Sequence, residues 1–414
     1  MRPTRLPVVT TLGRPIPTLL VTVTGPDRPG VTVALSEALS IPGVAVVDVE
    51  QVIVRGHLTL AFLVTTGVDV NAVVAAAEHV GHSMGMQVTC LAGSGDQAPR
   101  RSGRLHVTII GAPLLPAAVA RIAGAVAAHG ANIDRIRRLA RDPVTCLEFD
   151  VSGGDVHVLR RELAEQAATH GVDVSVSEAG LSRRGRRLVV MDVDSTLIQD
   201  EVIEMIAAHA GREAEVAHVT ARAMRGELDF AESLHARVAH LAGLPATVLD
   251  DVRNSIRLTP GARTLCRTLL RLGFTLAVVS GGFIEVVGPI AGDLGIHHAH
   301  ANQLEVVDGQ LTGRVTGEVV DRAAKAAALR RFAAAEGLPL SRTVAIGDGA
   351  NDIDMLAEAG LGIAFNAKPL VRQSAEASVN VPYLDTVLYL LGIPRSEVED
   401  ADALALTDSS FESA

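Results

Sequence analysis

The chain has 414 residues, of which 48% are hydrophobic and only 2% aromatic, so we expect several cores built from aliphatic side chains. The net charge of −10 is spread along the chain, which argues against nucleic acid as a partner, because a phosphate backbone requires clustered Lys and Arg. We find no signal-peptide pattern and no uncharged apolar run of the roughly 18 residues that a membrane span needs, and we therefore expect a soluble, cytoplasmic protein without a membrane partner.

Two small, polar stretches divide the chain. Residues 93–103 and 179–187 are rich in Gly, Ser and Arg, which is typical of linkers. They separate four predicted segments, at residues 16–92, 104–178, 188–393 and 394–414. The last of these is acidic, and we expect it to form a short helix with a loose end.

The first two segments resemble each other. One begins with LLVTVTG and the other with LHVTIIG, and each is a β-branched run typical of a strand. Apolar residues with helical spacing follow each run, and then come a hairpin, a second helix at 71–84 or 155–170, and a last strand. The sequence thus predicts two βαββαβ units, each with a ferredoxin-like fold.

From residue 188 onward, strand-like runs alternate with helical segments, which predicts an α/β fold with a Rossmann-like parallel sheet covered by helices. The strand-like runs are LVVMDV, FTLAVVS, TVAIGD and LGIAF. A long, mostly helical insertion at about 200–258 follows the first run. It is too long for a simple crossover, so we expect a small helical cap.

Asp192 and Asp194 end the first of these strands, at the edge where α/β sheets bind ligands. One carboxylate can attack phosphorus and form an aspartyl phosphate, while the other can protonate the leaving alkoxide and later activate water. Both negative charges favour a hard, oxygen-ligated cation such as Mg²⁺. Taken alone, the two acids could equally belong to an ordinary polar turn.

Three further motifs carry groups that suit phosphate chemistry. Asp348 and Asp352 in GDGAND add carboxylates, enough with Asp192 to build a Mg²⁺ site. Ser280 and Gly281 follow a strand and could form an anion site. Lys325 lies on an Ala-rich segment, where its ammonium could offset developing charge. Each motif alone has a simpler interpretation as a turn, a helix cap or a solvated surface lysine.

In this order, the motifs resemble the four motifs of the haloacid dehalogenase superfamily, over roughly residues 188–393. The resemblance implies that Asp192 is the nucleophile and that Asp194 is the general acid and base, with its backbone carbonyl also on Mg²⁺. It implies that Asp348 completes the metal ligands with support from Asp352. The residues that it assigns to the phosphoryl group are Ser280, Gly281 and Lys325.

The cap carries a second, more specific resemblance. DVDSTLIQDEVIE, MRGELDFAESLHARV and GDGANDIDML are similar to phosphoserine phosphatases. A carboxylate such as Glu201 can pair with an α-ammonium, and Arg237 can bind an α-carboxylate through two parallel hydrogen bonds. The resemblance implies that these two residues bind the serine part, that Asn351 assists, and that Met224 and Phe230 line the apolar side of the cap. The implied reaction is the hydrolysis of O-phosphoserine, the last step of serine biosynthesis.

The two amino-terminal segments resemble ACT domains. The first contains Gly-Pro-Asp-Arg-Pro-Gly between strand and helix, which looks like a ligand loop and suggests Asp27 and Gly30 as regulatory residues. The second segment has Gly111 at the same place but lacks the Asp-Arg-Pro-Gly sequence. The resemblance implies a homodimer with an amino-acid effector such as serine. An alternative is that these segments only dimerise.

Three other functions stay open on the sequence alone. The chain could be a phosphatase or phosphotransferase for another small phosphate ester. It could be an amino-acid-sensing protein with a vestigial catalytic body, although the complete set of Asp192, Asp194, Lys325 and Asp348 argues against this. It could also regulate a partner protein through its acidic tail, which only composition supports.

Overall fold

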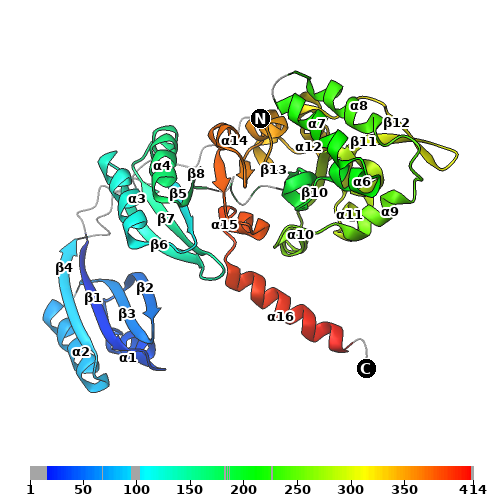
Figure 1. Cartoon of the computed structure of the whole chain (residues 1–414). Coiled ribbons are helices and arrows are strands. Elements are labelled where there is room, and N and C mark those ends of the chain that lie inside the picture. Colours follow the sequence, from blue (N-terminus) through cyan, green and yellow to red (C-terminus); the bar gives the residue numbers. More distant parts are fainter. Residues whose placement is uncertain are drawn as a thin grey trace, which may run out of the picture. The chain divides into compact units, whose positions relative to one another are not determined.

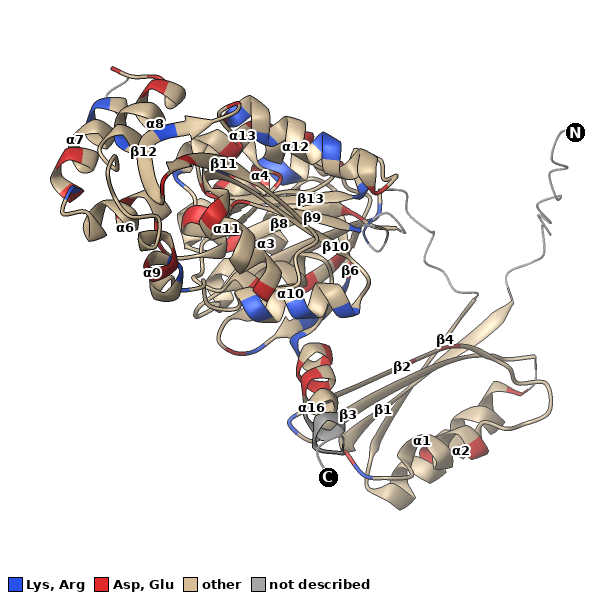
Figure 2. Ribbon diagram, turned by 90° about the vertical axis from the view of Figure 1, so that its right-hand side faces the viewer, with Lys and Arg blue, Asp and Glu red and all other residues tan. Residues whose placement is uncertain are grey.

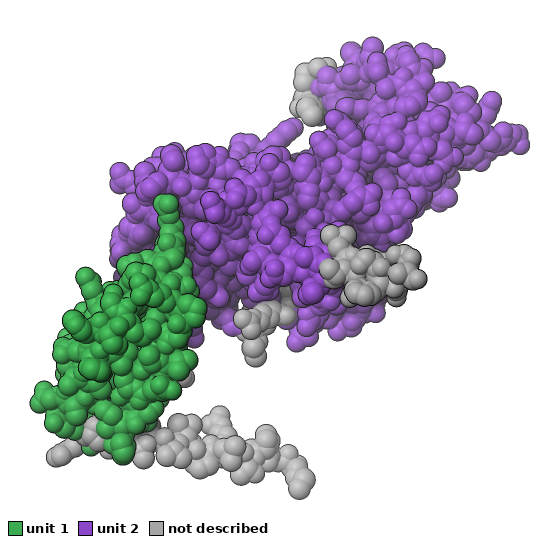
Figure 3. Space-filling view, turned by 90° about the horizontal axis from the view of Figure 1, so that it is seen from below, with its two compact units in different colours: residues 1–100 green, residues 101–414 purple. Residues whose placement is uncertain are grey.

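Figure 1 presents a computed structural model of the chain. The structure describes residues 16–67, 69–94, 103–180, 183, 185, 187–224 and 227–411, with side chains for all of these except 224 and 406–411. The chain divides into two compact units, residues 1–100 and 101–414, which Figure 3 colours green and purple. No described helix combines the length and the apolar character that crossing a membrane would require.

The first unit is a four-stranded antiparallel sheet with the strand order β2-β3-β1-β4 and two helices. Its elements are β1 (Pro17–Pro26), α1 (Val31–Ala38), β2 (Val46–Val54), β3 (His57–Thr65), α2 (Val70–Met84) and β4 (Gln87–Ser94). Buried residues alternate along β1 and β3, so one face of the sheet forms the core with the helices. This order confirms the predicted ferredoxin-like fold.

The second repeat has the same element order, and its second helix has the same caps as that of the first repeat. Its elements are β5 (Leu105–Gly111), α3 (Pro116–Ala128), β6 (Asn132–Ala140), β7 (Thr145–Ser152), α4 (Val156–His170) and β8 (Asp173–Glu178). Asp69 and Asp155 cap the amino-terminal ends of α2 and α4 with their side chains. Gly85 and Gly171 end these helices with φ of 66° and 64°, a conformation that favours glycine. The repeated sequence pattern therefore predicted repeated structure.

The rest of the second unit is built around a seven-stranded sheet with the order β12-β11-β10-β9-β13-β14-β15. Its strands are β9 (Leu188–Met191), β10 (Thr275–Phe283), β11 (His298–Val307), β12 (Gln310–Thr316), β13 (Thr343–Gly347), β14 (Gly362–Phe365) and β15 (Ala377–Val379). All four residues of β9 are buried, because this central strand is covered on both faces. Only β12 is antiparallel to its neighbour. The parallel α/β sheet is confirmed, with β11, β12 and β15 as strands that we did not predict.

Helices surround this sheet, and one group of them forms the cap. The cap helices are α6 (Val202–His209), α7 (Glu213–Met224), α8 (Phe230–Ala239) and α9 (Val248–Ser255). The other helices are α10 (Ala262–Arg271), α11 (Ile284–Asp293), α12 (Arg322–Ala335), α13 (Ile353–Glu358), α14 (Pro369–Ser374), α15 (Val387–Leu390) and α16 (Arg395–Phe411). The base of the cap is bonded to the β11–β12 hairpin, where Gly243 N donates to Leu311 O at 2.8 Å.

The second repeat and the seven-stranded sheet belong to one unit and meet along their edge strands β8 and β15. Asn380, just after β15, donates its backbone N–H to Oδ2 of Asp173 at 2.7 Å. The acidic helix α16 is tied to α10, because Asp402 pairs with Arg267 and Arg271. Acidic and basic residues are interspersed along the described helices (Figure 2), in line with a net charge that is spread along the chain.

Candidate active site

A cavity of about 440 Å³ lies between the cap and the carboxyl ends of the central parallel strands. Its sheet-side lining consists of Asp192, Asp194, Gly281, Gly282, Asp348, Gly349, Ala350 and Asn351. Its cap-side lining consists of Glu201, Ile203, Thr220, Ala223, Leu228, Asp229, Phe230, Ser233, Leu234 and Arg237. Parallel strands end at the same edge of a sheet, so motifs that are far apart in the sequence converge here.

Asp192, which lines this cavity, forms a buried ion pair with Lys325. Oδ1 of Asp192 accepts a hydrogen bond from its neighbour Val193 N at 2.7 Å, and the same oxygen lies 2.7 Å from Lys325 Nζ as an ion pair. Lys325 is fully buried on α12 and also donates to Asp352 Oδ1 at 2.7 Å. Burial alone would lower the pKa of Lys325, but the two carboxylates outweigh it and raise the pKa, so the lysine stays charged.

The two carboxylate oxygens of Asp194 have different partners. Oδ1 accepts from Val202 N at 2.8 Å, and Oδ2 accepts from Ser280 Oγ at 2.9 Å. Ser280 Oγ itself accepts from Gly282 N at 2.7 Å, so its hydroxyl proton is directed at Asp194. Burial raises the pKa of Asp194, although these hydrogen bonds oppose the rise. A raised pKa suits a carboxyl group that must donate a proton near neutral pH.

The glycines after Ser280 form a bulge. The pairing of β10 with β11 shifts register between Ser280 and Phe283, so Gly281 and Gly282 project from the strand. A Cβ atom at Gly282 would lie 2.9 Å from Asp194 Oδ2, so a side chain there would press on the carboxylate. A further hydrogen bond stabilises the bulge, because Nδ2 of the buried Asn302 donates to Gly281 O at 2.8 Å. No local motif marks Asn302, and the sequence reasoning missed it.

Three carboxylates form a cluster that could hold a metal ion. Oxygens of Asp192, Asp348 and Asp352 all lie within 4.8 Å of one another. Burial and the neighbouring Asp352 raise the pKa of Asp348 to about 6, and Thr196 Oγ1 donates to its Oδ1 at 2.9 Å. Among the described residues, Lys325 pairs with two of these three carboxylates, so an excess of negative charge remains, which fits a hard divalent cation. The carboxylate of Asp194 is not part of this cluster. The role of its backbone carbonyl in binding metal stays a prediction.

Two oppositely charged cap residues, Glu201 and Arg237, line the cavity. Glu201 Oε1 accepts from Ser195 Oγ at 2.9 Å, and burial, followed by the charge of Asp194, raises the pKa of Glu201 to about 7. Arg237 Nε donates to Ser233 O at 3.3 Å. Burial lowers the pKa of Arg237, and Glu201 opposes this effect. A carboxylate and a guanidinium in one cavity can pair with the two charges of an amino-acid zwitterion.

The other predicted substrate residues are distributed as follows. Asn351 lines the cavity on the sheet side and Phe230 on the cap side. The ring of Phe230 lies over Gly281, where a Cβ atom would approach Phe230 Cζ to 3.1 Å. Met224 is the last residue of α7, and its side chain lies outside the described residues.

The three predicted regulatory residues lie outside this cavity. Asp27 and Gly30 belong to the loop between β1 and α1, where Gly30 has φ of 96°. Gly111 ends β5, and a Cβ atom there would lie 3.0 Å from Leu114 Cα. Their role in binding an effector stays a prediction.

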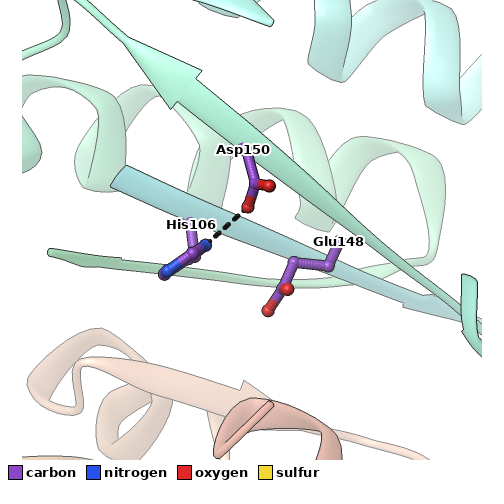
Figure 4. Close-up of side chains that lie close together, drawn as sticks. All are labelled: His106, Glu148 and Asp150. Atoms are coloured by element: carbon purple, nitrogen blue, oxygen red, sulfur yellow. Dashed lines mark hydrogen bonds and ion pairs between the residues drawn. The ribbon is translucent and has the colours of Figure 1, made fainter. Parts of the chain in front are cut away.

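A second group of titratable residues lies on the sheet of the second repeat (Figure 4). His106 Nδ1 lies 2.8 Å from Asp150 Oδ1, and Arg137 Nη2 lies 2.6 Å from Glu148 Oε1. Arg183 Nη1 lies 2.5 Å from Glu148 Oε2, as an ion pair that lacks the alignment of a hydrogen bond. Because arginines already neutralise Glu148, we interpret the group as a partly buried ion-pair network and not as a metal site.

Comparisons with known proteins identify the families to which the parts of the chain are similar. Residues 189–357 match the haloacid dehalogenase-like hydrolases, and residues 17–90 and 105–177 match ACT domains. A phosphoserine phosphatase of Streptomyces coelicolor is 60% identical over 94% of this chain and 96% of its own length. Phosphoserine phosphatase SerB2 of Mycobacterium tuberculosis is 54% identical over 93% and 95%. A crystal structure of a probable phosphoserine phosphatase from Vibrio cholerae, 34% identical, covers 72% of this chain and 88% of that one with a TM-score of 0.57.

Proposed function

Because the chain belongs to the phosphoserine phosphatase family of haloacid dehalogenase-like hydrolases, with two ACT domains ahead of the hydrolase domain, we propose that it hydrolyses O-phospho-L-serine to serine and phosphate. One observation supports this most strongly: the acids of the sheet and the Glu201–Arg237 pair of the cap line a single cavity. The sheet side suits the phosphoryl group, and the cap side suits the amino-acid part.

In the first step, a carboxylate oxygen of Asp192 attacks phosphorus, and the bond between phosphorus and the serine oxygen breaks. Lys325 Nζ and Val193 N both contact Oδ1 of Asp192, so neither of these two contacts involves Oδ2. Asp194, with its raised pKa, donates the proton that the leaving serine oxygen takes up. Ser280, Gly281 and Lys325 bind the phosphoryl oxygens from the remaining sides.

In the second step, Asp194 acts as a base. As a carboxylate, it takes a proton from water, the water oxygen attacks phosphorus, and the bond to Asp192 breaks, which restores the free enzyme. Asp192, Asp348 and Asp352, together with the backbone carbonyl of Asp194, would hold Mg²⁺. When bound, this ion supplies positive charge that offsets the charge of the transferring phosphoryl group.

The serine part is recognised by charge. Arg237 binds the α-carboxylate and Glu201 pairs with the α-ammonium, while Asn351, Phe230 and Met224 complete the surroundings. An arriving ammonium would favour the ionised form of Glu201, whose pKa is about 7 without it. Substrate binding and ionisation of Glu201 therefore support each other.

Phosphate release from O-phospho-L-serine, from an aryl phosphate and from phosphorylated alcohols without an amino group tests this function. We expect strong preference for phosphoserine in kcat/KM and loss of activity with EDTA. Equal turnover of all substrates would support a general phosphatase instead. Transfer of the phosphoryl group to an added alcohol, in place of water, would support a phosphotransferase.

We also propose that the ACT domains bind an amino-acid effector such as serine and join two chains. The outer strand β2 supports the second part, because all nine of its residues are exposed. Val46, Val52 and Val54 are 60%, 55% and 63% exposed. An exposed outer strand that carries several apolar side chains is commonly covered by a partner. Light scattering measures the oligomeric state, and a serine effect that exceeds product competition would support the effector.

A further inference from the structure

The cap is joined to the sheet by two chain segments that pair with each other. Ile198 and Leu258 form an antiparallel bridge, and Gln199 N donates to Arg257 O at 2.9 Å. Next to them, Arg257 N donates to Asp200 Oδ2 at 2.9 Å. The two connections therefore form one short two-stranded element, which we call the hinge. It leads directly into the turn that carries the catalytic acids.

Thr259 lies where this hinge meets the catalytic turn, residues 193–197. Its hydroxyl Oγ1 donates to Thr196 O at 2.7 Å, and its N–H donates to Leu197 O at 3.0 Å. Thr259 is 6% exposed and Thr196 is 0% exposed. Water therefore has no access to replace the hydroxyl, and its removal would leave a buried carbonyl without that partner.

Thr196 connects Thr259 to the proposed metal site. Its side-chain hydroxyl donates to Asp348 Oδ1 at 2.9 Å, while Thr259 holds its carbonyl. The preceding residue, Ser195, has φ of 55°, a left-handed conformation that costs energy for any residue with a side chain. Such a turn persists only when its surroundings hold it, and the two bonds from Thr259 are part of that support.

We propose that Thr259 is a positioning residue for the metal site and the catalytic turn. Its hydroxyl fixes Thr196, which in turn orients the carboxylate of Asp348. This inference rests on the metal-binding part of the proposed function. Loss of a direct hydrogen-bond partner of a metal ligand typically weakens metal binding about 10–100-fold. Thr259 is one residue further from the ligand than Thr196, so we expect a loss of about 3–10-fold.

The test compares three variants that retain nearly the same shape at the substituted position. Thr259→Val removes the hydroxyl, Thr259→Ser keeps it, and Thr268→Val is the matched control. Thr268 is also a buried threonine, 7% exposed on α10, and its hydroxyl has no hydrogen-bond partner among the described residues. Calorimetry measures Mn²⁺ binding to the metal-free protein. The Asp348→Asn variant lacks a ligand of this site, so the Mn²⁺ binding that it loses is the binding at this site. Phosphate release measures the Mg²⁺ concentration that gives half-maximal activity.

We expect Thr259→Val to weaken Mn²⁺ binding about 3–10-fold and to raise the half-maximal Mg²⁺ concentration by a similar factor. Thr259→Ser and Thr268→Val should stay within about twofold of the unmodified protein. Mn²⁺ affinity in Thr259→Val equal to that of the Thr268→Val control would overturn the proposal, as would equal losses in the valine and serine variants. These affinities do not depend on phosphoserine turnover, so a wrong substrate assignment would not be mistaken for a failure here.

Two additions keep the test decisive. Thr259→Ala, which is smaller than valine and cannot clash, replaces Thr259→Val if the latter does not fold. In a Thr196→Val background, the path to Asp348 is already broken, so Thr259→Val should add less than about twofold to the loss of Mn²⁺ affinity. Additive losses would show that Thr259 does not act through Thr196.

Discussion

The ammonium of Lys325 lies 2.7 Å from Oδ1 of Asp192, and both side chains are buried. Burial, followed by the charge of Asp352, raises the pKa of Asp192, and the ammonium of Lys325 opposes this rise. Lys325 also holds Asp352, so one cation is shared by two carboxylates. The remaining negative charge is the physical reason to expect a divalent cation.

The first prediction concerns Asp192. Asp192→Asn should lower kcat for phosphoserine by at least about a thousandfold, because an amide oxygen cannot form the phosphorylated intermediate. The fold should persist, because asparagine has nearly the same volume and removes one of several neighbouring negative charges. Phosphate release and circular dichroism check the two parts. Turnover within about tenfold of the unmodified enzyme would rule out Asp192 as the nucleophile.

The second prediction separates recognition of serine from phosphoryl chemistry. Arg237→Ala should lower kcat/KM for phosphoserine by about 30-fold or more, because a buried charge pair is lost on binding. Turnover of an aryl phosphate, which has no α-carboxylate, should fall by less than about threefold. Arg212→Ala is the control, since Arg212 is a cap arginine that is 56% exposed and pairs with Glu215. Equal losses on both substrates would refute the recognition role of Arg237.

The third prediction concerns pH and metal. In the metal-free protein, the pKa of Asp348 is raised from 3.8 to about 6 by burial and by Asp352. Between these values the folded protein binds more protons than the unfolded chain, so this group destabilises the fold as pH rises. A cation on Asp348 removes that penalty by competing with the proton. At a fixed Mg²⁺ concentration, the rise in Tm should be larger at about pH 7.5 than at about pH 5.5.

Asp348→Asn provides the control for this measurement. It should abolish most of the Mg²⁺-dependent rise in Tm at both pH values, because the metal site loses a ligand. A rise in Tm that is the same at both pH values in the unmodified protein would mean that Asp348 does not titrate as described.

The fourth prediction concerns the joint between the second ACT domain and the hydrolase domain. Arg183 is 7% exposed, pairs with Glu148, and donates its Nη2 to Leu390 O at 3.1 Å. Arg183→Met should lower the free energy of unfolding by about 3 kcal/mol, because it leaves Glu148 buried with Arg137 as its other partner. Denaturant unfolding measures this change.

An exposed ion pair is the matched control for Arg183. Arg330 is 51% exposed and pairs with Glu358, so Arg330→Met should cost less than about 1 kcal/mol. Adding Glu148→Gln to Arg183→Met should recover part of the lost stability, because it removes the buried charge that Arg183 no longer neutralises. No recovery would mean that the contacts of Arg183 with backbone carbonyls, and not the ion pair, stabilise the joint.

Much of the site could be predicted because its chemistry lies in short motifs at strand ends. Asp192, Asp194, Ser280 and Asp348 each follow an apolar run, and the parallel sheet brings the ends of such runs together. The hairpin of β11 and β12 was missed, because β11 mixes His, Asn and Glu with apolar residues. Its turn, Asp308-Gly309, is nevertheless a common hairpin signal and could have revealed it.

The supporting residues could not be predicted in the same way. Asn302 and Thr259 act through hydrogen bonds to the backbone of segments distant in the sequence. Their residue types are common, and no local pattern says which carbonyl they will meet. Only the packing of β11 and of the hinge against the catalytic turn brings these partners together.

The most direct test of the account is to look for the phosphorylated enzyme. Rapid acid quench of the enzyme mixed with ³²P-labelled phosphoserine and Mg²⁺, followed by peptide mapping, detects a covalent phosphoryl group. We predict a hydroxylamine-sensitive label on the peptide that contains Asp192, formed and lost at rates that match turnover. Turnover without any labelled protein, or a label on a peptide that lacks Asp192, would contradict the mechanism.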